Sequence, residues 1–331
     1  MDLDAYSAAH RDEWDELARL SSRRRSGGAD ADDLIERYQA GASQLSAMQA
    51  STGSSVQGDR LSLALSRARL QFTGAGTNVL SRLPAFFWNQ LPAALYRVRW
   101  LSLAVTAATA LIAVLYALWA LNTPGVLQSF GTEELRRKFA EEDFVSYYSN
   151  NGMASFTALV WTNNAWLAAQ CVAFGIIGVY APYLLFTNAM NLGLAAALMG
   201  SHGRIDVFFL YIAPHGQLEL YSIFVAGAAG LMIFWSWIAP GPRTRVQALA
   251  EDGRALITIA IGLALALLVS GLIEGFVTRQ DWPWPIKIGI GTVALGAFLI
   301  YQWVIGGRAF RAGETGDLDE FESGARRIVA G

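Results

Sequence analysis

Repeated apolar runs constrain the fold of this chain more than any other feature of its sequence. An α-helix that crosses a membrane needs about 20 predominantly apolar residues. Runs of this length lie at 100–121, 219–238, 255–277 and 286–305, and the longer run 157–199 has room for two spans. The sequence therefore predicts an all-α fold, a polytopic helical membrane protein with about six transmembrane helices.

The composition agrees with this prediction. The chain is 53% hydrophobic and only 16% charged, whereas typical soluble domains have about 25% charged residues. Its formal net charge of -2 gives no reason to expect a nucleic-acid partner. Cys171 is the single cysteine, which excludes an intramolecular disulfide and a cysteine-based zinc cluster. The acidic start MDLDAYSAAH has no apolar core, so we expect no cleaved signal peptide.

The polar segments divide the chain into regions. Residues 1–99 are predicted to be a cytoplasmic helical region that ends in an interfacial helix, because aromatic residues there mix with proline and arginine. Residues 100–305 form the predicted six-span domain, and 306–331 a cytoplasmic tail. Between the first two spans, the polar segment 122–156 is long enough for a helix, which predicts an outer helical insert.

The distribution of basic residues predicts the orientation. Cytoplasmic loops of membrane proteins carry an excess of Lys and Arg. If both termini are cytoplasmic, the cytoplasmic segments are 1–99, the turn at 175–182, 239–254 and 306–331. The outer segments are then 122–156, 200–218 and 278–287. Most of the 25 Lys and Arg residues lie in the cytoplasmic segments, which supports this orientation.

The fourth span carries two unusual residues at its start. His215 and Glu219 lie one above the other on a helix, because positions four apart share a face. Ionisable residues in a membrane are costly, so such a pair needs partners. Small residues continue along and beside this face, and they allow close helix packing. They are Ser222, Ala226, Gly227 and Gly230.

Other spans bring polar side chains to the middle or outer half of the membrane in this topology. These are Asn163, Asn164, Gln170, Asn188, Asn191, Ser270 and Glu274. Their convergence with His215 and Glu219 indicates a polar pocket that opens outward. The alternative is a structural network, because such side chains often make only interhelical hydrogen bonds of about 0.6 kcal/mol each. The sequence leaves both interpretations open.

The histidine and the carboxylates allow several kinds of chemistry. Such a pair can exchange a proton, bind a metal, or orient one another. His215, Glu219 and Glu274 have the composition of a zinc site with one nitrogen and two carboxylates, but their spacing alone does not demand a metal, and we expect no cofactor. The signatures HExxH, GxSxG and GxxxxGK are absent. Catalytic residues therefore stay unassigned.

Several short motifs resemble the stage II sporulation protein M family. PHGQLE followed by IFVAGAAGL is similar to its signature, and TNNAW at 162–166 to its asparagine pair. NAMNLG at 188–193 resembles its asparagine–glycine segment, with Ala189 where a glycine is usual. IEGFV at 273–277 resembles the acidic motif in the family's fifth span. DEWDELARL near the N-terminus looks like the version found in actinobacteria.

The resemblance implies a multi-pass protein of the bacterial cytoplasmic membrane. In spore formers the family member is implicated in engulfment, where it anchors two extracytoplasmic proteins that degrade peptidoglycan. Many members occur in bacteria that do not sporulate, and the family is not established as an enzyme. The resemblance thus predicts a scaffold or anchor for envelope-remodelling proteins. Membrane lipids and a second copy of the chain, in a homodimer, are further expected partners.

Two other classes of function stay open. A transporter or lipid-handling protein, or an intramembrane enzyme, would use an outward-facing pocket built on His215, Glu219 and Glu274. A scaffold predicts that changes in 122–156 impair function and that His215→Ala is tolerated. A transporter or an enzyme predicts the reverse.

Overall fold

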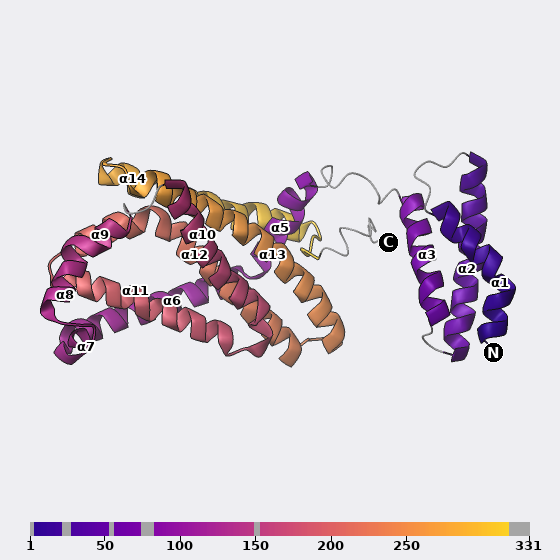
Figure 1. Ribbon diagram of the computed structural model, residues 1–331, viewed down its shortest axis with the longest axis horizontal. Helices are drawn as coiled ribbons and strands as arrows, with labels where there is room; N and C mark the ends of the chain where they lie inside the picture. The colour runs from indigo at the N-terminus through magenta and orange to yellow at the C-terminus, as the bar shows by residue number, and fades with distance from the viewer. Residues whose placement is uncertain (1–2, 22–27, 53–55, 74–82, 149–152, 318–331) are drawn as a thin grey trace. The chain divides into compact units, whose positions relative to one another are not determined.

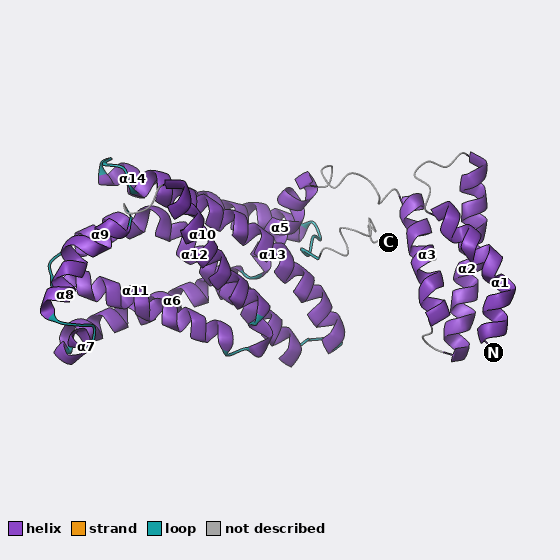
Figure 2. Ribbon diagram, in the orientation of Figure 1, coloured by secondary structure: helices purple, strands orange, loops and turns teal. Residues whose placement is uncertain are grey.

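The computed structural model describes residues 3–21, 28–52, 56–73, 83–148 and 153–317. Most of these residues are helical and none of them forms a strand (Figure 2), which confirms the predicted all-α fold. The chain divides into two compact units, Met1–Arg82 with Glu320–Gly331, and Leu83–Asp319.

The first unit is built from three helices. These are α1 (Leu3–Ser21), α2 (Gly28–Thr52) and α3 (Val56–Thr73), each packed against the other two (Figure 1). Their apolar stripes meet in one core that includes Leu17, Met48 and Leu61. At its edge the Trp14 indole donates a hydrogen bond of 2.7 Å to Gln44 Oε1. Stripes that look thin in the sequence therefore suffice once three helices share them.

The second unit contains the helices that are candidates to cross a membrane. Among the residues that the structure describes, five segments have the necessary length and apolar composition. They are α6 (Arg99–Asn122), α11 (Tyr180–Ser201), α12 (Ile205–Ile238), α13 (Arg245–Ile273) with η4 (Glu274–Thr278), and α14 (Trp284–Ile300) with η5 (Tyr301–Ile305) and α15 (Gly306–Arg311).

The remaining predicted span corresponds to α10 (Met153–Ala173). It has 21 residues and packs against α12 and α13. Its asparagines and Gln170 make it more polar than the five candidate spans, and it is not among them. The 3-10 turn η3 (Gly175–Ile177) and Gly178, with φ 74°, connect α10 to α11. This connection lies inside the predicted turn 175–182.

Helix α12 is the centre of the second unit. It packs against α6, α10, α11, α13 and α14, while α6 and α11 lie side by side (Figure 1). Every residue from 221 to 230 is buried. A Cβ on Gly227 would press against the side chain of Leu185 on α11, and one on Gly230 against the Cys171 carbonyl on α10. The small-residue stripe therefore packs helices within one chain.

Two helices begin ahead of the apolar runs that predict their spans. Helix α12 begins at Ile205, before the predicted span 219–238, and continues through Pro214. Its first turns are stabilised by aromatic residues, because Phe208 stacks on Phe144 with ring centroids 6.0 Å apart. Helix α13 begins at Arg245, not at about Ala255, because Thr244 and Gln247 form a capping box there.

The polar insert after the first span folds into a series of short helices. They are α7 (Pro124–Gln128), α8 (Glu133–Lys138), η2 (Phe139–Asp143) and α9 (Phe144–Tyr147). We call residues 124–148 the helical cap. Ala140, Phe144 and Tyr148 of the cap pack in one apolar cluster with residues of α10, α11 and α12. The cap is thus fixed to the helix bundle and is not a free loop.

The segment before the first span packs into the unit as well. It comprises η1 (Phe86–Gln90) and α5 (Leu91–Arg97), and α5 contacts α13 and α15. Its residues from Leu91 to Leu95 are buried among these helices, while Trp88 is exposed. Its predicted place at the membrane interface stays a prediction.

A charged network ties α5 to the start of α13. Asp252 is 2% exposed and accepts hydrogen bonds from Arg97, from Arg243 at 3.0 Å and from Ser236 at 2.5 Å. Arg97 also donates to the Thr315 carbonyl at 3.0 Å. The network joins α5, α12, α13 and the segment that follows α15.

Candidate functional site

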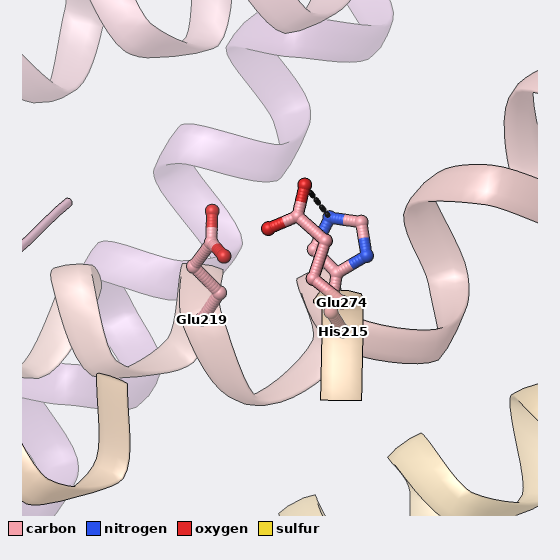
Figure 3. Close-up of side chains that lie close together, drawn as sticks. All are labelled: His215, Glu219 and Glu274. Carbon is pink, nitrogen blue, oxygen red and sulfur yellow. Dashed lines mark ion pairs between the residues drawn. The ribbon is translucent and has the colours of Figure 1, made fainter. Parts of the chain in front are cut away.

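A histidine and two glutamates meet between α12 and the end of α13 (Figure 3). His215 and Glu219 lie one turn apart on α12, as the four-residue spacing predicts. Glu274 comes from η4, and its Oε1 lies 3.7 Å from His215 Nε2. Each of the three residues offers one ligand atom, and these atoms lie within 4.8 Å of one another.

The backbone around Glu274 is unusual. Residues Glu274–Thr278 form a π-helical turn directly after α13. Such turns insert an extra residue into a helix and are frequent at functional sites. Here the turn places both Glu274 and Thr278 against α12, and both are buried.

Two hydroxyl groups hold the cluster in place. Ser270 Oγ donates to the His215 backbone carbonyl at 3.0 Å and lies 3.4 Å from Glu219 Oε2. Thr278 Oγ1 lies 3.2 Å from His215 Nδ1. The imidazole and the Glu219 carboxylate are therefore both oriented by residues of the neighbouring helix.

Charge is buried here with little compensation. His215 is 4% and Glu274 3% exposed, while Glu219 is half-buried. Glu274 Oε2 is fully buried and has no hydrogen-bond partner in the described part of the chain. Among the same residues, no Lys or Arg forms an ion pair with either glutamate. A buried carboxylate is costly unless it is neutralised or paired.

The cap covers the histidine. The Tyr148 ring lies 6.2 Å from the His215 ring and 5.0 Å from the Tyr211 ring, measured between centroids. Burial, and to a lesser degree the charges of Glu274 and Glu219, raise the pKa of the Tyr148 phenol, which therefore stays protonated. A neutral aromatic residue thus separates the cluster from the cap's charged surface.

The remaining predicted polar residues are Gln170 and four asparagines. Gln170 accepts a hydrogen bond of 2.9 Å from the Tyr180 hydroxyl and so joins α10 to α11. Asn163 and Asn191 are exposed, and Asn164 and Asn188 are half-buried. No hydrogen bond among the described residues links these asparagines to His215 or the glutamates. One shared pocket for all nine residues stays a prediction.

Sequence reasoning missed two residues of the site. Thr278 continues the row Ser270–Glu274 at four-residue spacing, so extending that row would have found it. Tyr148 comes from a different segment, and no local pattern points to it. The charged network around Asp252 was missed too, because its partners are distant in sequence.

The arrangement is suited to two kinds of chemistry. A neutral imidazole beside two carboxylates can accept and pass on a proton. The same three side chains are ligands that zinc-class ions prefer, one nitrogen and two oxygens.

Fold and site together define a helical protein with five candidate membrane spans, organised around a central helix that contributes to a buried histidine–glutamate cluster. The chain belongs to the stage II sporulation protein M family, since the model of that family matches residues 102–279. This match confirms the resemblance of the motifs and includes the three clustered residues. A second model, described as a domain of unknown function (DUF8413), matches residues 4–74, the three helices of the first unit. No curated protein and no solved structure matches the chain.

Proposed function

We propose that the chain is an anchor in the bacterial cytoplasmic membrane that holds cell-envelope remodelling proteins. The observation that carries this proposal is the division into two compact units, each with its own core. A transporter or an intramembrane enzyme needs only the membrane unit. A separate compact helical unit is suited to binding partners in the aqueous phase.

The cap supports the proposal from the second unit. Its inner side is fixed to the bundle through Phe144 and Tyr148. Its outer side exposes many charged residues at close spacing, among them Glu134, Lys138 and Glu141. Charged side chains on a rigid surface give specificity in binding more than affinity. We propose that this side of the cap is a docking surface.

The orientation and the assembly belong to the same proposal. In the proposed orientation, which the excess of basic residues supports, both termini are cytoplasmic, so that the first unit is cytoplasmic and the cap, one span later, is outside. Envelope partners then bind the cap, and cytoplasmic partners bind the three-helix unit. A homodimer, the commonest assembly of soluble oligomers, is the proposed form.

Complementation of a deletion strain tests the anchor. The double variant Glu141→Lys, Glu142→Lys reverses charge on the cap, and Gln128→Lys on α7 is the control. Glu141, Glu142 and Gln128 are all exposed. We expect the double variant to reach the membrane at normal level and to lose most envelope labelling by a fluorescent D-amino acid, while the control restores it.

Site-specific photocrosslinking supplies the second measurement. A crosslinking residue at Glu141 should give one discrete protein adduct, and the same residue at Val293, 73% exposed on α14, should not. Normal function of the cap variant, together with complete loss in Glu274→Gln, would refute the anchor.

The second candidate function is transport, lipid handling or intramembrane catalysis. One observation favours it, the buried pair of His215 and Glu274 with Nε2 and Oε1 3.7 Å apart. If this second function is the correct one, Glu274→Gln fails to complement the deletion strain, whereas the cap variant Glu141→Lys, Glu142→Lys complements it.

A further inference from the structure

We propose that His215, Glu219 and Glu274 bind a divalent metal ion of the zinc class. This inference goes beyond the anchor function and does not depend on it. The ion would be held by one imidazole nitrogen and two carboxylates from α12 and η4, inside the second unit (Figure 3).

The distances between the ligand atoms fit such an ion. Zinc binds nitrogen and oxygen at about 2.0–2.2 Å in tetrahedral geometry, so neighbouring ligands lie about 3.3–3.6 Å apart. His215 Nε2 and Glu274 Oε1 are 3.7 Å apart, which is too long for a hydrogen bond. All three ligand atoms lie within 4.8 Å of one another.

The surroundings of the ligands are those of a metal site. A metal-bound histidine commonly donates its other ring N–H to an oxygen, which fixes the tautomer. Here Nδ1 lies 3.2 Å from Thr278 Oγ1, and in the tautomer that carries its proton on Nδ1 the Nε2 lone pair is available to a metal ion. Ser270 Oγ lies 3.4 Å from Glu219 Oε2 and orients that carboxylate.

Charge and an unpartnered atom point to a cation. When both glutamates are ionised they carry two negative charges, which one divalent ion neutralises. Glu274 Oε2 is buried without a hydrogen-bond partner among the described residues. Figure 3 shows the Glu274 carboxylate between the imidazole and Glu219, so its oxygens face into the cluster. Without a cation, ionised carboxylates are costly to bury in this way.

The ligand set selects the kind of metal. Calcium takes six to eight oxygen ligands, and magnesium an octahedral oxygen shell with several waters. An imidazole with two carboxylates suits zinc and its neighbours in the first transition row. Three protein ligands leave the fourth position of a tetrahedral zinc ion for water or another ligand.

Metal content of the full-length protein tests the proposal. The protein is expressed in zinc-supplemented medium with an affinity tag that lacks histidine, purified in lipid nanodiscs, and measured by mass spectrometry. We expect about one zinc ion per wild-type chain. The variants His215→Ala and Glu274→Gln should each lose at least about tenfold in metal content, because each removes a ligand.

A second histidine–glutamate pair in the same chain supplies a matched control. His202 Nε2 lies 3.2 Å from Glu133 Oε1 near the protein surface, and His202→Ala should keep the wild-type metal content. Cobalt binding adds an independent measurement, since Co²⁺ in a tetrahedral nitrogen–oxygen site gives visible absorption bands. We expect these bands in metal-stripped wild type and in His202→Ala, and none in Glu274→Gln.

The outcomes separate a metal from a shared proton. Wild type that holds no zinc and gives no cobalt bands overturns the proposal, and the two carboxylates then share a proton. Equal metal content in wild type and Glu274→Gln overturns it as well. If His215→Ala fails to fold, the wild-type and Glu274→Gln measurements decide alone, because glutamine keeps the shape of glutamate.

Discussion

At the scale of single residues, the packing of α12 depends on positions that have no side chain. Gly230 lies where α12 meets the end of α10, and a Cβ there would collide with the Cys171 carbonyl and lie 3.3 Å from the Gly175 Cα. Neither is the end of a flexible side chain, so the helices themselves must move apart. Close contact of this kind is what small residues provide in membrane helices.

Gly230→Ala is therefore expected to destabilise the second unit by about 1–3 kcal/mol, the typical cost of overpacking. Thermal unfolding in detergent can be followed with a thiol-reactive dye, because Cys171 is the single cysteine and is fully buried. The variant should react at a lower temperature than wild type.

Gly296→Ala on α14 is the matched control, since nothing lies within 4 Å of a Cβ at Gly296. Alanine is the better helix former by up to about 1 kcal/mol, so this change should leave the transition unchanged or raise it. An equal loss in both variants would show that the contact with Cys171 is not responsible.

The residues of the candidate site could be predicted only in part. His215 and Glu219 follow from the period of a helix, and Glu274 from the depth at which its span places it. Thr278 continues the four-residue row of Ser270 and Glu274, but no pattern in the sequence indicates the π-helical turn that carries it. The asparagines were grouped with them by depth alone, and depth does not say which way a side chain faces around its helix. Asn163 and Asn191 are in fact exposed.

At the scale of elements, the cap shows how a polar segment becomes ordered. Residues 133–143 carry mostly charged side chains, yet Ala140, Phe144 and Tyr148 recur at four-residue spacing on one side. Phe144 is 8% exposed and its ring lies 6.0 Å from that of Phe208. One apolar face thus attaches the cap to α12.

Phe144→Ala should release the cap while the bundle stays folded. Removal of a buried phenylalanine costs about 3–5 kcal/mol, because it leaves a cavity in the apolar cluster that holds the cap. Hydrogen exchange followed by mass spectrometry should show faster exchange in residues 133–147 and unchanged exchange in α13.

Phe130, also in the cap, is 46% exposed and provides the control. Phe130→Ala should leave the exchange of the cap near the wild-type rate. If Phe144→Ala accelerates exchange throughout α12 and α13 as well, the cap and the bundle form one cooperative unit and the prediction is wrong.

Element boundaries were the least predictable part of the fold. The apolar run alone places the start of the fourth span at about Glu219, because the segment before it contains Asp206, Pro214 and His215. The helix nevertheless begins at Ile205, since the aromatic residues of its first turns pack on the cap. Tertiary contacts of this kind lie outside any local window.

At the scale of the whole molecule, the chain combines two units that match two different families. The three-helix unit coincides with the match to residues 4–74, and the second unit contains the match to 102–279. The sequence predicted helices in the first region but no separate compact unit, because each apolar stripe is thin by itself. Only their assembly buries Leu17, Met48 and Leu61 almost completely.

Separate cores predict separate unfolding. Leu17 is 1% exposed in the core of the first unit, and Leu17→Ala should cost about 2–5 kcal/mol. That is a large part of the stability available to a small helical unit. Hydrogen exchange of the full chain in nanodiscs should therefore lose protection across α1, α2 and α3, while α12 and α13 exchange as in wild type. Leu63→Ala, the same substitution at a position that is 53% exposed on α3, should change neither unit. Loss of protection in α12 together with α1 would mean that the two units fold as one, and the anchor would then lack the independent docking unit on which its proposed function rests.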